Sequence, residues 1–120
     1  MTLPPMNYEP RGGRNAVRSK KHRDWIRKHE CILYERKDCV GPVDVAHCRD
    51  VVEFNERGGM GAKPSDVFTV SLCRKHHRES EKRERAFGAE YGIDMRAKCL
   101  EFAKASPDKA IRDAAKAYKP

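Results

Sequence analysis

Two short stretches of the chain alternate hydrophobic and polar positions. Residues 42–47 and 67–72 are rich in β-branched side chains, a composition that favours strands. Residues 15–30 and 73–87 are densely charged and free of Gly and Pro, and we predict a helix over each. Asp94 can cap a helix over 95–105, and Ser106-Pro107 can begin another over 107–118. Two strands followed by a helix form a ββα arrangement, so we expect an α+β fold.

Composition limits the size of the core and the class of protein. The chain has 120 residues, of which 38% are hydrophobic and 37% charged, so we expect one domain with a small core. No apolar run approaches the ~20 residues that a membrane helix needs. The first ten residues lack a basic segment followed by an apolar one, so we do not expect secretion. We expect a cytoplasmic location.

The net charge of +8 points to a polyanionic partner, usually nucleic acid. Most of this charge lies in the first quarter of the chain. We predict a flexible basic arm over 1–14 and a basic helix over 15–30, with Lys20, Lys21 and Arg23 contacting nucleic acid. A solvated helix face explains the same residues equally well.

The cysteines favour metal binding over disulfides, because they number five and no secretion signal precedes them. Cys31-x7-Cys39 and Cys73-x2-His76 supply the four N and S ligands of a structural zinc site. The first spacing is unusually wide, so His29 is an alternative to Cys39. Buried free thiols are the alternative to a metal site. We expect Cys48 and Cys99 to take no part.

His77 and Glu81 are four residues apart and would share one face of the predicted helix. They would then offer one nitrogen and one oxygen to a divalent ion distinct from the zinc. His76, adjacent to His77, would point about 100° away, toward the zinc ligands. Taken alone, a solvated ion pair or hydrogen bond explains His77 and Glu81 better.

Three strings carry a resemblance to a known family: Ala46-His47-Cys48-Arg49, residues 59–66 (GMGAKPSD) and residues 72–79 (LCRKHHRE). In this order they resemble the HNH, or ββα-metal, nuclease superfamily. Within it they resemble the phage and prophage group that includes the YbcO-type nucleases and the RecA-dependent nuclease Ref. The resemblance covers Cys31 to about Tyr91, roughly half of the chain.

The resemblance implies a small ββα-metal core with a zinc knuckle, flanked by N- and C-terminal helices, and hydrolysis of a phosphodiester. By position, His47 matches the general base, Asp66 the middle polar residue and His77 the metal ligand on the helix. Asp66, His77 and Glu81 would hold Mg²⁺ or Mn²⁺. Two positions depart from the family: Ala46 replaces an acidic metal ligand, and Phe68 stands where an Asn is usual.

The functional hypothesis is a metal-dependent endonuclease, encoded by a phage or prophage, that acts on DNA in a bacterial or phage-infected cell. Its nuclease core spans 31–92, and helices over 93–120 pack on it. Arg49 and Lys63 would contact phosphates, although each also fits a solvated loop charge. A recombination or replication protein is a further conceivable partner. The alternatives are a catalytically idle, zinc-stabilised nucleic-acid-binding module and a protein-binding phage factor with a relic HNH core.

Overall fold

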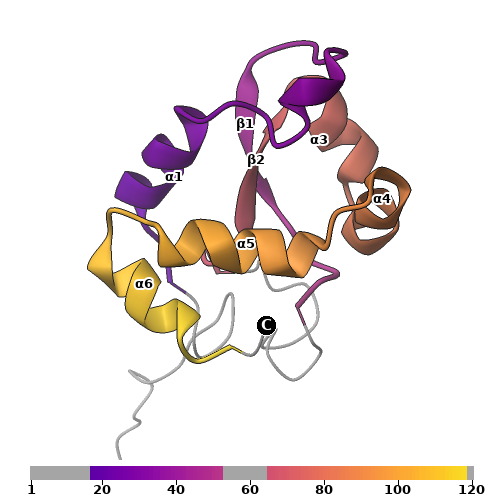
Figure 1. Ribbon diagram of the computed structural model, residues 1–120. Helices are drawn as coiled ribbons and strands as arrows, with labels where there is room; N and C mark the ends of the chain where they lie inside the picture. The colour runs from indigo at the N-terminus through magenta and orange to yellow at the C-terminus, as the bar shows by residue number, and fades with distance from the viewer. Residues whose placement is uncertain (1–16, 53–64, 119–120) are drawn as a thin grey trace, which may run out of the picture.

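The computed structural model describes residues 17–52 and 65–118, and within them the chain forms an α+β fold (Figure 1). The predicted arm over 1–14 and most of the predicted loop over 49–66 lie outside these residues. The elements in chain order are helix α1 (Lys20–Arg27), the 3-10 helix η2 (Tyr34–Arg36), strands β1 (Val43–His47) and β2 (Thr69–Cys73), and helices α3 (Arg74–Ser80), α4 (Glu84–Tyr91), α5 (Met95–Lys104) and α6 (Lys109–Ala115).

The two strands form an antiparallel sheet, in a register that runs from Val43 opposite Cys73 to His47 opposite Thr69. Each strand lies within about two residues of its predicted position. All residues of β2 are buried, and the chain also covers both of its edges. β1 pairs with one edge, and on the other the Ile32 N–H donates to the Ser71 carbonyl at 3.0 Å.

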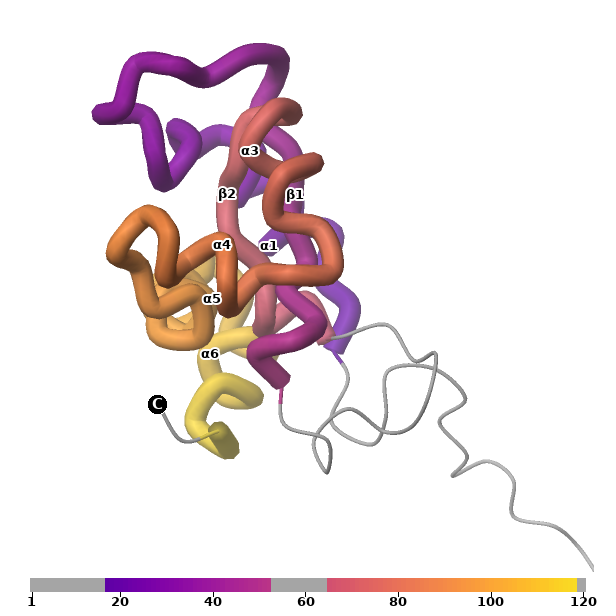
Figure 2. Tube along the Cα trace, turned by 90° about the vertical axis from the view of Figure 1, so that its right-hand side faces the viewer, coloured from indigo at the N-terminus to yellow at the C-terminus, as the bar shows by residue number. Residues whose placement is uncertain are grey.

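The helices surround this hairpin (Figures 1 and 2). In Figure 1, α5 crosses below the strands, with α1 on one side and α3 and α4 on the other. Met95, Leu100 and Ala103 of α5 join Val70 and Leu72 of β2 in the core. The core is completed by residues of the loops and of α4 and α6, among them Leu33, Val51, Val67, Phe68, Phe87, Ile111 and Ala115.

The predicted helix over 73–87 is wrong, because the chain breaks between Ser80 and Glu84. Lys82 adopts a left-handed conformation with φ 65°, and its N–H donates to the Glu84 carboxylate at 3.1 Å. The break turns α4 back, so that Phe87 is fully buried. Glu81 therefore follows α3, with an extended ψ of 129°.

The other helices begin or end close to their predicted limits. α1 is shorter than predicted and begins after Ser19, whose side chain accepts from the His22 N–H. Asp94 caps α5 as predicted. α6 begins later than predicted, because Asp108 and not Ser106 caps it. The Ser106 hydroxyl instead contacts His22 Nδ1 at 2.8 Å. Within the described residues, none of these helices is long and apolar enough to span a membrane.

Candidate functional site

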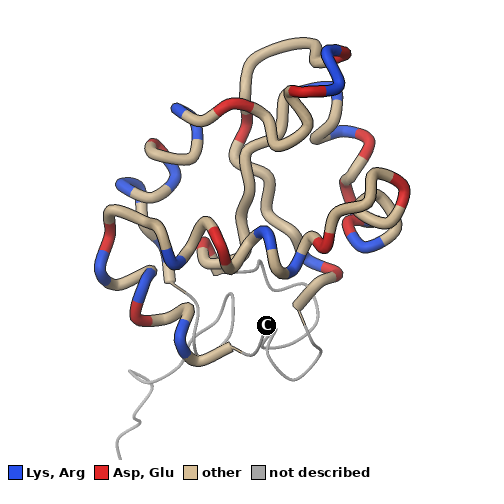
Figure 3. Tube along the Cα trace, in the orientation of Figure 1, with Lys and Arg blue, Asp and Glu red and all other residues tan. Residues whose placement is uncertain are grey.

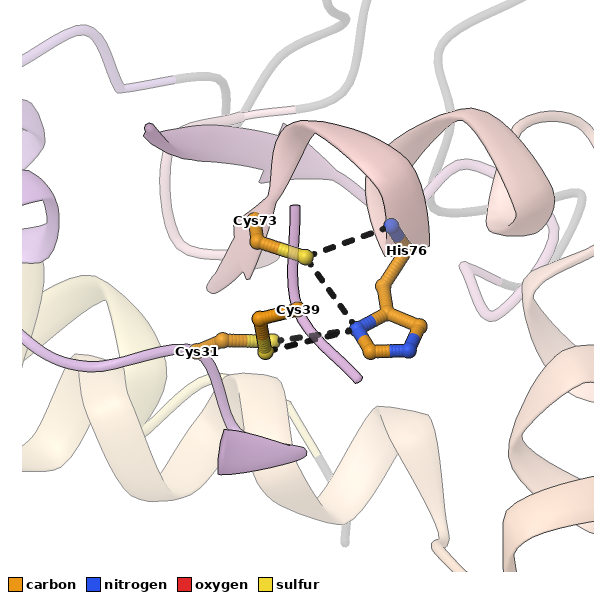
Figure 4. Close-up of side chains that lie close together, drawn as sticks. All are labelled: Cys31, Cys39, Cys73 and His76. Carbon is orange, nitrogen blue, oxygen red and sulfur yellow. Dashed lines mark hydrogen bonds between the residues drawn. The ribbon is translucent and has the colours of Figure 1, made fainter. Parts of the chain in front are cut away.

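Cys31, Cys39, Cys73 and His76 form a group that can hold a metal ion, with their ligand atoms all within 4.8 Å of one another. Cys31 and Cys39 lie on either side of η2, whereas Cys73 caps α3 and His76 lies in its first turn. Figure 4 shows the three sulfur atoms gathered on one side of the His76 ring. The distances from His76 Nδ1 to the sulfurs of Cys31, Cys39 and Cys73 are 3.6, 3.8 and 3.2 Å.

These distances suit tetrahedral zinc. Bonds of about 2.3 Å to sulfur and about 2.0–2.1 Å to nitrogen put S and N roughly 3.6 Å apart across a tetrahedral angle. Desolvation and the neighbouring thiols raise the pKa of Cys39 to about 12. Desolvation also raises the pKa of Cys31. Thiolates this crowded need a cation among them, so the donor set fits zinc. In the described structure His29 is not part of the group, and its Nδ1 lies 2.9 Å from the Trp25 carbonyl.

The ring nitrogen of His76 that faces away from the sulfurs is the described structure's one buried side-chain polar atom without a hydrogen bond. The Asp38 carboxylate is its nearest charged neighbour, with Oδ1 at 3.2 Å from Nε2. His76 Nε2 and Asp38 Oδ1 are thus close enough for an ion pair but are not aligned as a hydrogen bond. Lys75 Nζ donates to the other Asp38 oxygen at 3.0 Å and to the Asp38 carbonyl at 3.1 Å.

His47 and Asp66 form a second, separate site at the end of β1. His47 Nε2 lies 2.7 Å from Asp66 Oδ1, with the imidazole 22% exposed and the carboxylate 1% exposed. An ionised carboxylate only accepts hydrogen bonds, so Nε2 carries the proton and Nδ1 is left as an acceptor. Among the described residues no hydrogen bond reaches Nδ1, so it can take a proton from a bound water.

The surroundings of Asp66 keep it ionised. Burial alone would raise its pKa, but His47, the Ser19 N–H and Arg23 outweigh burial and lower the pKa to about 2. The Ser19 N–H and Arg23 Nη1 both donate to Asp66 Oδ2, at 2.7 and 2.6 Å. Asp66 thus ties His47 to the start of α1, and its charge holds the imidazole in one orientation.

The structure pairs His77 with Asp44 of β1, not with Glu81. His77 Nδ1 lies 3.0 Å from Asp44 Oδ2. Arg74 donates to both oxygens of the same carboxylate at 3.0 Å and, together with His77, holds the pKa of Asp44 at about 2. Glu81 lies beyond the end of α3 and is exposed. The helix break described above is the physical reason that the expected pair does not form.

The residues expected to share one catalytic metal therefore lie in two places. Asp44 and His47 are three positions apart on β1 and so point to opposite faces of the hairpin. On one face His47 contacts Asp66, and on the other Asp44 contacts His77 of α3. Among the described residues, the Cys/His cluster is the one group of three or more closely placed metal ligands. The predicted Mg²⁺ or Mn²⁺ ligands Asp66, His77 and Glu81 do not form a second.

A family model matches residues 2–106 of the 120-residue chain; its description is a protein of unknown function, DUF968. The chain belongs to the DUF968 family. It is similar to the uncharacterized protein YdfU of Escherichia coli strain K12, with 29% identity over 97 residues. That alignment covers 78% of this chain and 27% of YdfU, so the chain spans about a quarter of that relative. No solved structure shows a significant match.

The basic residues singled out in this DUF968 chain have different surroundings. Lys20 and Lys21 are exposed on α1, and Lys20 pairs with Asp24 at 2.7 Å. Arg23 turns inward to Asp66. Arg49 follows β1 and is half-buried, and Lys63 lies outside the described residues. The chain also has a cationic pocket that the sequence did not reveal, lined by Lys104, Lys109, Arg112, Asp113 and Lys116.

Sequence reasoning also missed Asp38 and Asp44. Asp38 directly precedes a ligand, Cys39, and Asp44 alternates with the valines of a strand in which an inward charge needs a partner. These two positions could have marked Asp38 and Asp44 as candidates. The sequence still does not indicate their partners, since His76 and His77 are more than thirty residues away.

Proposed function

We propose that this chain is a zinc-stabilised nuclease domain that hydrolyses phosphodiester bonds of nucleic acid, with DNA as the expected substrate. The observation that carries the proposal is the 2.7 Å contact between His47 Nε2 and Asp66 Oδ1. A buried carboxylate that orients a partly exposed imidazole is the arrangement of a general base. The resemblance of the strings around His47, Asp66 and His77 to the HNH superfamily points to the same chemistry.

In the proposed reaction, His47 Nδ1 takes a proton from water as the water oxygen attacks phosphorus. The P–O3′ bond breaks, and the 3′ oxygen leaves and is protonated from solvent. Asp66 stays ionised and stabilises the imidazolium that forms. The described residues do not assemble the Mg²⁺ or Mn²⁺ site expected from the sequence, so the proposed steps use His47 and Asp66 alone.

Zinc is proposed as the ion of the Cys/His cluster, with a structural role. Four protein ligands close a tetrahedral site and leave no position for substrate. The cluster joins the loop around η2 to the end of β2, and a metal bond here supplies folding free energy to a small core.

Two cationic surfaces would carry the nucleic-acid backbone. One comprises Lys20 and Lys21 of α1, and the other is the pocket of α5 and α6. The Ser19 N–H donates a hydrogen bond to Asp66, and the Ser19 hydroxyl donates one to Asp108, the cap of α6. Because Ser19 directly precedes α1, these bonds place both surfaces next to the His47 site. Figure 3 shows Lys and Arg positions along both α1 and α6 on one flank of the molecule.

The decisive experiment compares His47→Ala with His29→Ala, a variant that removes an imidazole outside the site. Both are tested on single-stranded, duplex and branched DNA and on RNA, with Mg²⁺, with Mn²⁺ and with EDTA. General bases contribute roughly 10²- to 10⁴-fold, so His47→Ala should lose cleavage by that factor while it keeps zinc and binding. His29→Ala should cut within a few-fold of wild type. Equal rates for His47→Ala and wild type would refute the role of His47.

The second candidate function is the catalytically idle nucleic-acid-binding module. The pairing of Asp44 with both His77 and Arg74 favours it, because the described residues then hold no preformed site for a divalent ion apart from the Cys/His cluster. Its signature would be salt-dependent binding of nucleic acid with no cleavage under any of the ion conditions above. Cleavage that depends on His47 would exclude this function.

A further inference from the structure

His76 has one ring nitrogen facing three sulfurs and the other buried without a hydrogen bond. Nδ1 lies 3.2–3.8 Å from the cysteine sulfurs, whereas Nε2 is buried and makes no hydrogen bond. If Nδ1 binds the metal, Nε2 must carry the proton. A buried N–H without an acceptor is costly, so the site needs an acceptor at this position.

Asp38 is placed to be that acceptor. Its Oδ1 lies 3.2 Å from Nε2, and no other carboxylate contacts this nitrogen in the described structure. The loop that carries Cys39 therefore brings both a ligand and an adjacent acceptor to the same histidine.

Lys75 holds this carboxylate in place from the far side. Its ammonium group donates to Asp38 Oδ2 and to the Asp38 carbonyl. Lys75 also precedes His76 in α3, and its own N–H donates to the Val40 carbonyl at 3.1 Å. Lys75 thus fixes residues on both sides of Cys39 to the helix that carries His76.

We propose that Asp38 is a positioning residue for the metal centre, which fixes His76 as an Nδ1 ligand with its proton on Nε2. Carboxylates behind a metal-bound histidine raise its basicity, and removing such partners typically costs about 10- to 100-fold in metal affinity. The inference rests on the proposed zinc site but does not depend on nuclease activity.

The test measures zinc affinity by competition with a chromogenic chelator in the full chain. Asp38→Ala should weaken zinc binding by about 10- to 100-fold. Asp38→Asn, which keeps an acceptor oxygen but not the charge, should recover part of this loss. Glu35→Ala is the matched control, because it removes a carboxylate from the same loop without a described contact to His76. It should stay within about three-fold of wild type.

A second readout distinguishes positioning from loop stability. In the zinc-loaded protein, nitrogen NMR should show a protonated His76 Nε2, and its N–H signal should shift in Asp38→Ala. The Co²⁺-substituted protein should keep, in every variant, the charge-transfer intensity expected for three thiolate ligands.

Three results would overturn the inference: Asp38→Ala and Glu35→Ala with equal affinity, a proton on Nδ1, or an unshifted Nε2 signal. Wild-type protein without zinc would refute the zinc proposal itself. A zinc-loaded wild type with an indifferent Asp38→Ala would refute the positioning role alone.

Discussion

Asp66→Asn tests whether the buried carboxylate holds both the fold and the general base. The pKa of Asp66 is lowered from 3.8 to about 2, because the contacts from His47, the Ser19 N–H and Arg23 outweigh its burial. A difference of nearly two pKa units corresponds to roughly 2 kcal/mol of stability at neutral pH, at about 1.36 kcal/mol per unit. The amide cannot replace the charge, and it leaves Arg23 without its partner. We therefore expect a loss of about 2–4 kcal/mol.

The assay is urea unfolding of zinc-loaded wild type and variant across pH. Because the folded-state pKa is depressed, the stabilisation is fully present above the unfolded pKa of 3.8 and is lost as pH falls toward 2. The difference between wild type and Asp66→Asn should be constant from pH 7 to about 5. It should fall by about half near pH 3. Protonation of the cysteines destabilises both proteins in acid, so only their difference is compared.

Two results would refute this reasoning. A difference below about 0.5 kcal/mol at pH 7 would mean that the contacts to Asp66 contribute no more than an exposed ion pair. A difference that does not shrink below pH 4 would mean that the loss is steric and not electrostatic. In either case the orienting role of Asp66 toward His47 would lose its support.

Two further predictions concern the metal ligands and α3. Cys73→Ser should reduce zinc from one ion per chain to almost none and unfold the domain, as measured by elemental analysis and circular dichroism; a folded, zinc-free variant would contradict it. His77→Ala should destabilise the hairpin, because Asp44 loses one of its two partners, whereas Glu81→Ala should leave thermal stability within about 0.5 kcal/mol of wild type. If cleavage requires Mn²⁺ or Mg²⁺ and both variants raise the concentration required, the pair expected from the sequence forms in the working enzyme after all.

The strands and the Cys/His cluster could be predicted from the sequence because their signals are local. Alternation of β-branched residues fixes β1 and β2 to within about two residues. The Cys73-x2-His76 spacing suits the start of a helix, where a cap residue and the third helical position face the same way. The seven residues between Cys31 and Cys39 contain η2, a short 3-10 helix.

The break after Ser80 could not be predicted, because no Gly or Pro marks it. It depends on contacts between distant parts of the chain. Glu84 accepts from the Asp50 N–H at 3.1 Å as well as from Lys82, and Phe87 must turn back to the core. A helix continued past Ser80 would carry Phe87 away from β2. The pattern of charges over 73–87 is compatible with either course, so the i,i+4 spacing of His77 and Glu81 could not by itself establish that they pair.

The register of the hairpin places the two sites at opposite ends of the sheet. Cys73 lies opposite Val43 at one end of the sheet, and Thr69 lies opposite His47 at the other. Four residue steps at about 3.3 Å each place these ends roughly 13 Å apart. An ion held by Cys73 is too distant to touch a phosphate whose attacking water is bound to His47. Loss of the metal can therefore affect His47 only through the fold, by disordering the strands or the start of α1 that holds Asp66 against His47. The proposed zinc and the proposed base are thus coupled through folding, and a variant that keeps the hairpin paired should keep the His47–Asp66 contact whatever happens to the chemistry at His76.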